Sequence, residues 1–277
     1  MRGVRIQARR LRMGLATLAG RPRGFFSPYR YAGAVLPPEG YPAVEAAFGA
    51  AEAAFAGVLD AIEAHGPRLA AFDGPPPEPR WGQSWFPRLD GAAAYVLARR
   101  ARRIVEVGSG HSTRFLARAV RDAGGDAARR ITCIDPAPRA ALRGLGVDWR
   151  ERVLGPGDMA LFEALGEGDV AFFDSSHILW PGSDVDIILN RILPVLKPGV
   201  LVHVHDVTLP DPYPPEWAWR GYTEQHALAG WILGGACAPV FASHYALSRM
   251  GAARRPGVAA LPLPAGAFET SLWLRRA

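Results

Sequence analysis

RIVEVGSGHST, residues 103–113, is the stretch from which the fold can first be inferred. A short apolar run contains Glu106, and Gly108 and Gly110 then precede a segment with a helical pattern. A strand, a glycine turn and a helix in this order are typical of nucleotide-type sites, because glycine allows sharp turns and close approach of a ligand. A dinucleotide-binding fingerprint would need a third glycine where Thr113 stands. Glu106 is therefore the discriminating residue.

Strand and helix patterns alternate beyond this stretch. Predicted helices, among them one over residues 137–145, separate the predicted strands, which are residues 103–108, 130–135, 149–154, 169–174 and 200–205. A further strand is predicted near residues 240–247. Alternation of this kind predicts a parallel sheet with helices on both faces. In such a sheet, ligands bind outside the carboxyl ends of the strands, and this is where we expect the functional residues.

The N-terminal part of the chain differs from the rest. Residues 1–30 contain eight arginines and no acidic residue, whereas the formal charge of the whole chain is only +6. An amphipathic helix is predicted over 44–65, and the proline-rich connector GPPPEPR follows at 74–80. We predict a basic and helical extension over residues 1–79 and one principal domain over residues 80–277.

Charge and composition exclude several classes of protein. Without its arginine-rich start, the chain is slightly acidic and lacks the basic footprint of a nucleic-acid-binding protein. Two cysteines, Cys133 and Cys237, give neither a disulfide framework nor a C-x-x-C zinc site, so a reducing cytoplasm is expected. The sequence has no stretch of about 18 consecutive apolar residues, so we expect no membrane span. The basic arm is interpreted as a solvated helix, with contact to an acidic partner or membrane surface, or a transit peptide, as alternatives.

The motif formed by Glu106, Gly108 and Gly110 resembles the first motif of the class I S-adenosylmethionine (SAM) dependent methyltransferases. ITCIDP (131–136), DVAFFDSSH (169–177) and LKPGVLVHVHD (196–206) resemble later motifs, in the family's order. The resemblance covers roughly residues 80–277. The resemblance implies a doubly wound, seven-stranded, mostly parallel Rossmann-like sheet closed by an antiparallel pair near the C-terminus. FPRLDG (86–91) and YTEQ (222–225) resemble one bacterial subfamily of methyltransferases without an assigned substrate.

The resemblance also implies which residues bind SAM. The glycine turn would wrap the methionine part, and an acidic residue after the second strand would hold the ribose. The implied cofactor-binding residues are Glu106, Gly108, Ser109, Gly110, Ser112, Asp135, Asp158 and Asp174. From the residues alone, Ser112 and Thr113 could equally cap the first helix, Asp158 could be an N-cap, and Asp174 could cap a helix.

DSSH and HVHD also raise the question of a divalent metal ion. Some relatives of this fold hold Mg²⁺ by a carboxylate after the fourth strand and a pair of residues after the fifth. Asp174 and Asp206 match this pattern, while His205 in the third position would better suit Mn²⁺, Fe²⁺ or Zn²⁺. Without a metal, His177 or His205 is the candidate general base, and His177 is preferred because it lies beyond the strand. Either histidine could instead hold a loop.

The sequence therefore predicts a cytoplasmic, bacterial SAM-dependent methyltransferase (EC 2.1.1.-), acting on an oxygen or nitrogen of a small metabolite or glycan precursor. Alternatives are a metal-dependent hydroxylase-like enzyme and a non-catalytic SAM-binding protein on the same fold. An aromatic, proline-rich loop over 210–222 is predicted to be a substrate lid or a cover over the sheet edge. The expected partner is a small-molecule substrate, and a homo-oligomer is compatible with the sequence.

Overall fold

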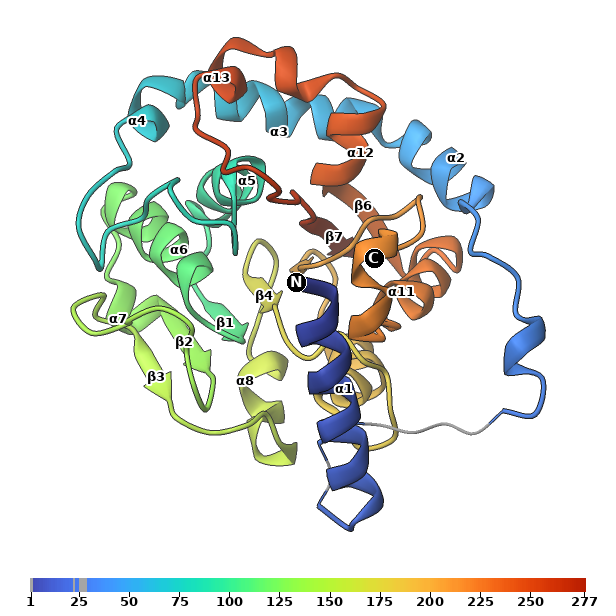
Figure 1. Ribbon diagram of the computed structural model, residues 1–277. Coiled ribbons are helices and arrows are strands. Elements are labelled where there is room, and N and C mark those ends of the chain that lie inside the picture. Colours follow the sequence, from blue (N-terminus) through green and yellow to red (C-terminus); the bar gives the residue numbers. More distant parts are fainter. Residues whose placement is uncertain (1, 22, 25–28) are drawn as a thin grey trace.

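The computed structural model describes residues 2–21, 23–24 and 29–277. Its sheet has seven strands in the order β3–β2–β1–β4–β5–β7–β6 (Figure 1). Strands β1 to β5 are parallel, and β7 runs antiparallel to both β5 and β6. The strands are β1 (Ile104–Val107), β2 (Ile131–Ile134), β3 (Asp148–Arg150), β4 (Val170–Phe173), β5 (Leu201–Val204), β6 (Cys237–Ala242) and β7 (Leu272–Arg276). The predicted seven-stranded, mostly parallel sheet is confirmed.

Helices cover both faces of the sheet (Figure 1). They are α1 (Arg2–Leu18), α2 (Pro42–Ala50), α3 (Glu52–Ala64), α4 (Gly66–Ala70), α5 (Arg88–Ala98), α6 (His111–Asp122), α7 (Ala127–Arg130), α8 (Met159–Glu163), α9 (Asp184–Ile187), α10 (Leu193–Val195), α11 (Glu224–Leu233), α12 (Ser243–Ser248) and α13 (Pro256–Ala259). Strands β1, β4 and β5 are buried along their whole length, as expected for parallel strands covered on both faces. Their carboxyl ends therefore meet at one edge.

Two predicted elements differ in the structure. A helix was expected over 137–145, but the chain there forms bends and turns, and Gly144 near the end of this segment takes a positive φ angle. A strand was expected over 240–247, but β6 ends at Ala242 and α12 follows directly. Tyr245 of α12 is thereby buried against Phe48, Phe55 and the sheet, which explains why packing outweighs the local strand preference.

The predicted helix over 44–65 is broken into α2 and α3, which meet at a bend of 61°. Phe48 precedes the bend and Phe55 follows it, and both rings contact Tyr245 edge to face, at centroid distances of 5.5 Å and 5.7 Å. Both side chains belong to the same hydrophobic core as the sheet, so the predicted boundary at residues 79 and 80 does not separate two cores.

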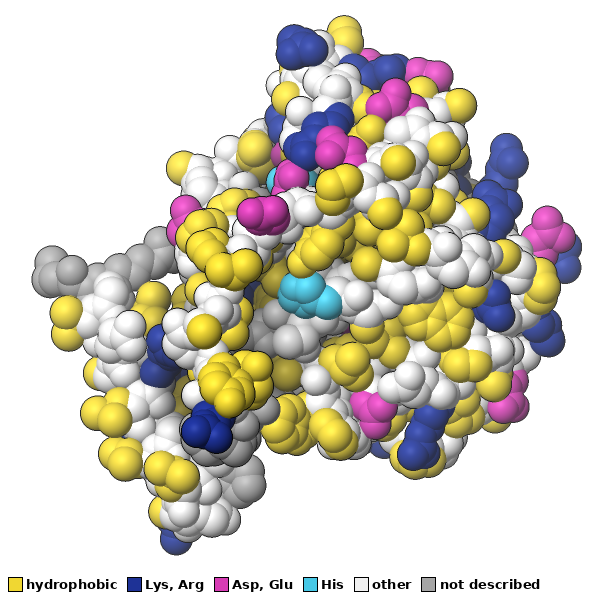
Figure 2. Space-filling model, turned by 90° about the vertical axis from the view of Figure 1, so that its right-hand side faces the viewer, with side chains coloured by type: hydrophobic (Ala, Val, Ile, Leu, Met, Phe, Trp, Pro, Cys, Tyr) yellow, Lys and Arg dark blue, Asp and Glu magenta, His cyan; other side chains and the backbone are white. Residues whose placement is uncertain are grey.

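Helix α1 lies outside this core, and Figure 1 shows it as a separate helix in front of the sheet. Its apolar residues Val4, Leu11, Leu15 and Leu18 are more than half exposed. Among the described residues, no single helix is long and apolar enough to cross a membrane, and α2 and α3 reach that length only as a bent pair. On the face seen in Figure 2, basic side chains are scattered among acidic and apolar ones.

Candidate functional site

Two adjacent hollows open near the carboxyl ends of the strands. The small hollow, of about 280 Å³, is lined by the glycine turn after β1 and by the loop after β2. The large hollow, of about 1130 Å³, is lined by the ends of β4 and β5, by the loop around residues 216–220 and by α1. Asp174 and Arg139 line both hollows. Asp174 therefore stands where contents of the two hollows would meet.

The glycine turn is dictated by its contact with β4. Gly108 has a φ of +78°, and a Cβ placed there would lie 1.7 Å from the backbone oxygen of Asp174. Gly108 and Ser109 line the small hollow, whereas Gly110 begins α6 and lies against the loop 139–140. Only glycine at position 108 lets the turn pack this closely on the end of β4.

Glu106 is fully buried beneath the turn and lines neither hollow. Its carboxylate accepts hydrogen bonds from the Ser112 hydroxyl at 2.6 Å, the Thr113 hydroxyl at 2.7 Å and the Cys133 thiol at 3.2 Å. Burial raises the pKa of Glu106 to about 7, although these three hydrogen bonds oppose the shift. In this structure, Glu106 and Ser112 hold the turn and the start of α6 together.

Asp135 joins the two loops that line the small hollow. It accepts hydrogen bonds from the backbone N–H of Ser109 at 2.6 Å and of Ala137 at 2.7 Å. The carboxylate also lies on the wall of this hollow, where a ribose was expected. Asp158 has a different position: it is buried, pairs with Arg152 and accepts from the Gly155 N–H. Asp158 lines neither hollow. It stands at the N-cap position of α8, but its side chain accepts no hydrogen bond from that helix and instead accepts the Gly155 N–H at the start of the short helical segment Pro156–Asp158.

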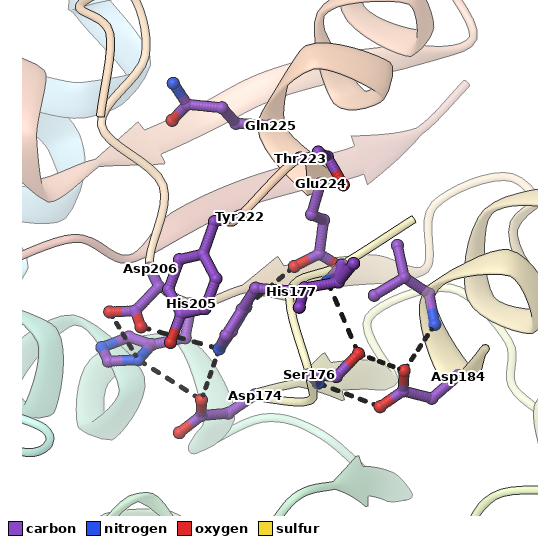
Figure 3. A network of polar contacts seen from close by, with 12 residues as sticks. Asp174, Ser176, His177, Asp184, His205, Asp206, Tyr222, Thr223, Glu224 and Gln225 are labelled. Atoms are coloured by element: carbon purple, nitrogen blue, oxygen red, sulfur yellow. Dashed lines mark hydrogen bonds and ion pairs between the residues drawn. The ribbon is translucent and has the colours of Figure 1, made fainter. Parts of the chain in front are cut away.

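A cluster of two imidazoles and two carboxylates lies beside the large hollow (Figure 3). His177 Nε2 lies 3.2 Å from Asp174 Oδ1 and 3.7 Å from Asp206 Oδ2. His205 Nδ1 lies 3.5 Å from Asp174 Oδ1 and 3.7 Å from Asp206 Oδ1. These are the candidate base and metal residues, and the fold brings all four together. Three of them, Asp174, His205 and Asp206, line the large hollow, whereas His177 is not part of its lining.

The backbone is strained at this cluster. His177 has a φ of 60° and Asp206 a φ of 53°, and these are the only non-glycine residues with positive φ in the part of the chain the structure describes. Left-handed backbone costs roughly 1–3 kcal/mol for a residue with a side chain. Strand β5 ends at Val204, so the turn at Asp206 brings its side chain to the same side as His205. Strand periodicity alone would have placed them on opposite faces.

The surroundings of the two imidazoles do not suit the predicted role of general base. Burial lowers the pKa of His177, but hydrogen bonds to Asp174 and Glu224 outweigh it and raise the pKa to about 10. The pKa of His205 is also raised well above its usual value, since Asp174 and Asp90 outweigh burial. Both imidazoles are therefore charged at neutral pH, and a charged imidazole cannot accept a proton. Their charges keep the pKa of Asp174 well below its usual value despite burial.

The same arrangement does not form a metal site. No group of three or more His, Cys, Asp or Glu side chains among the described residues is arranged to hold a metal ion. His177 Nε2 and His205 Nδ1 instead face the carboxylate of Asp174, at 3.2 Å and 3.5 Å from Asp174 Oδ1. The predicted ligands Asp174, His205 and Asp206 are thus neighbours, but they do not fit a metal ion in this geometry.

Other residues hold the cluster in place, and only weak signals in the sequence pointed to them. Glu224, at the start of α11, lies 2.9 Å from His177 Nδ1. Asp90 lies 3.3 Å from His205 Nε2 and accepts from the backbone N–H groups of residues 270 and 271. Asp90 lies in the first turn of α5, whose N-cap residue is Pro87. The motifs FPRLDG and YTEQ supply these two carboxylates, so the motifs were the available signal.

The aromatic loop forms one wall of the large hollow. Trp217, Trp219 and Arg220 belong to the short helical segment Pro215–Arg220, and all three line the hollow. Trp217 is buried against Phe268, at a centroid distance of 5.3 Å. Arg220 lies over the Trp217 ring and donates a hydrogen bond to Asp206 at 3.1 Å. The loop is therefore part of the wall, and movement of the loop as a lid stays a prediction.

Similarity to known proteins is found in two comparisons. Residues 105–207, which run from β1 to the residue after Asp206, match the family model described as a methyltransferase domain. A crystal structure of the methyltransferase PaMTH1 from Podospora anserina, bound to S-adenosylhomocysteine (SAH), matches with 20% sequence identity and a TM-score of 0.37. That match covers 79% of this chain and 88% of the other chain. No curated protein matches the sequence.

Proposed function

We propose that this protein is a SAM-dependent methyltransferase that transfers a methyl group to an oxygen or nitrogen atom of a small acceptor. In this proposal the small hollow holds SAM and the large hollow holds the acceptor. The observation that carries the proposal is that the two hollows share Asp174, so that a donor and an acceptor would meet beside one carboxylate. The match of residues 105–207 to a methyltransferase domain supports the same reaction.

The residues of the small hollow fit the cofactor. Val153 lines this hollow with 71% of its surface exposed, which offers an apolar face to a flat ring such as adenine. Asp135 offers a carboxylate for ribose hydroxyls, and Gly108 and Ser109 bring the turn to the wall of the hollow. When bound, SAM would supply a methyl group on a positively charged sulfur, which leaves as a neutral thioether.

Asp174 is the proposed catalytic residue for the acceptor. Because the charged imidazoles of His177 and His205 keep its carboxylate ionised, Asp174 can accept a hydrogen bond from the acceptor's hydroxyl or amine. This hydrogen bond would direct the lone pair of the acceptor atom toward the small hollow. Asp174 would then receive the acceptor's proton as the bond between the acceptor atom and the methyl carbon forms. His177 and His205 are positioning residues here, since each acts through Asp174.

Calorimetry tests the cofactor site. We expect SAM and SAH each to bind the wild-type protein at one site, and we expect Asp135→Asn to weaken binding by about ten-fold, because a charged acceptor is lost. Asp126→Asn is the matched control, since Asp126 caps α7 away from both hollows and asparagine caps equally well. Absence of heat with both ligands in the wild-type protein would remove the proposal.

Transfer of a labelled methyl group from SAM to a panel of small hydroxyl and amine compounds tests the acceptor site. For an acceptor found in this way, we expect Asp174→Asn to bind SAH normally and to lower turnover by about 100-fold or more. Full turnover of this variant would rule out the role of Asp174. A non-catalytic SAM-binding protein, the alternative, would bind SAH and methylate none of the compounds.

A further inference from the structure

Four arginines from three separate parts of the chain line the large hollow. Arg5 and Arg9 lie on α1, Arg139 lies on the loop after β2, and Arg220 ends the aromatic loop. Within residues 2–21, 23–24 and 29–277, Arg5, Arg9 and Arg139 make no ion pair with a carboxylate. Unpaired cations around one concave surface are a ready site for an anion.

Two of these arginines are held in place by tryptophans. The Arg139 guanidinium lies 4.5 Å from the centre of the Trp85 ring, and that of Arg220 lies 4.2 Å from the centre of the Trp217 ring. A guanidinium that lies over an aromatic ring keeps its N–H edge free, and this edge matches the paired oxygens of a phosphate. Trp85 and Trp217 also line the hollow, so ring surface accompanies the charge.

The carboxylates of this hollow are placed differently. Asp174 and Asp206 lie at the strand ends, where His177, His205 and Arg220 balance their charge. Glu216 is the remaining carboxylate of the lining and is exposed on the same segment as Trp217. The hollow therefore has polar, charge-balanced groups at the strand ends, and unpaired arginines on α1 and on the loop after β2. A ligand with a hydroxyl or amine at one end and an anionic group at the other would match both.

We propose that the acceptor is a phosphorylated small molecule, whose phosphate is bound by Arg5, Arg9 and Arg139 and whose ring or chain lies along Trp85 and Trp217. This assignment rests on the proposed function and names the class of its substrate. Helix α1 then contributes to substrate binding, although it lies outside the hydrophobic core and outside the residues that match a methyltransferase domain.

Binding of phenyl phosphate to the full-length protein, measured by calorimetry with SAH present, tests the proposal. Benzyl alcohol is the neutral comparison. We expect phenyl phosphate to bind at least about ten-fold more tightly than benzyl alcohol, and Arg5→Glu/Arg9→Glu to weaken its binding by about ten-fold or more. Arg10→Glu/Arg12→Glu is the matched control, because it makes the same change of net charge on the same helix at residues that do not line the hollow. We expect the control to change the affinity by less than about two-fold.

The outcomes separate this proposal from the proposed function. The assignment is supported if both double variants bind SAH as the wild-type protein does and only Arg5→Glu/Arg9→Glu loses phenyl phosphate binding. Equal loss in both double variants, or no phenyl phosphate binding by the wild-type protein, overturns it while leaving the SAM site intact. If the arginine pair instead serves lipid phosphates, Arg5→Glu/Arg9→Glu would release the protein from phosphatidylglycerol vesicles without changing phenyl phosphate binding, and this result would also overturn the assignment. Failure of SAH to bind would instead contradict the proposed function.

Discussion

Glu106 shows how a residue can be recognised in the sequence and still have an unexpected position. Its place before the glycine turn marked it as a cofactor residue, but its carboxylate is buried and bonded to Ser112, Thr113 and Cys133. Burial disfavours its charged form, and the pKa is therefore raised from 4.5 to about 7. A carboxyl group whose pKa is higher in the folded than in the unfolded chain makes the protein less stable as the pH rises.

We predict that this loss of stability takes place between about pH 4.5 and pH 7. Below the lower value Glu106 is protonated in both states, and above the higher value it is charged in both, so the loss is then complete. The shift corresponds to about 3 kcal/mol in the free energy of unfolding. Glu106→Gln keeps the shape without the titration. Denaturant unfolding at a series of pH values should show the free-energy difference, wild type minus variant, falling by about that amount across this range. A difference that is independent of pH would contradict the prediction.

At the scale of elements, the site depends on how the glycine turn meets the end of β4. The turn after β1 contacts the backbone of Asp174, and the segment after β4 is tied to α11, because the carbonyl of His177 accepts the N–H of Thr223 at 2.9 Å. Asp174 is thereby fixed between two elements that are far apart in the sequence. Any change that separates the turn from β4 should disturb both hollows, since Asp174 lines both.

Gly108→Ala is expected to be strongly destabilising. The added Cβ would overlap the Asp174 backbone oxygen, and the positive φ adds strain, so we expect a loss of about 3 kcal/mol or more together with weaker SAH binding. Gly146→Ala isolates the effect of φ, because Gly146 has a φ of +70° but nothing within 4 Å of an added Cβ. It should cost only about 1 kcal/mol. Equal losses in thermal or denaturant unfolding would show that the contact with β4 is unimportant.

At the scale of the whole molecule, helices from the N-terminal region complete the core of the sheet. Phe55 of α3 is fully buried and contacts Phe48, Phe241 and Tyr245, whereas α1 contributes no residue to this core. The N-terminal region thus has two parts with different roles. Residues 42–70 cover the sheet, and α1 lies at the large hollow.

We therefore expect residues 42–277 to unfold in one cooperative transition. Phe55→Ala should lower the free energy of unfolding by about 3–5 kcal/mol, because it leaves a cavity in the shared core. Leu15→Ala, on an exposed position of α1, should change the free energy by less than about 0.5 kcal/mol. Denaturant unfolding followed by both fluorescence and circular dichroism would test this prediction. Two separate transitions, only one of them sensitive to Phe55→Ala, would show that α2 and α3 form an independent unit.

The sheet, the order of its motifs and the edge at which polar residues gather could all be predicted from the sequence. Hydrophobic runs set the strands, and parallel strands direct all their carboxyl ends to one side, so Asp135, Asp174 and Asp206 could be placed together without a structure. Which polar residues face a hollow and which are buried follows only from the folded structure. Glu106 and Asp158 are buried and bonded to neighbouring side chains. Carboxylates from distant segments lie beside His177 and His205 and favour their protonated forms. The arginines of α1 line the same hollow as those of two other loops. Such environments depend on contacts between residues that can lie more than 100 positions apart in the sequence. These contacts cannot be inferred from local sequence patterns.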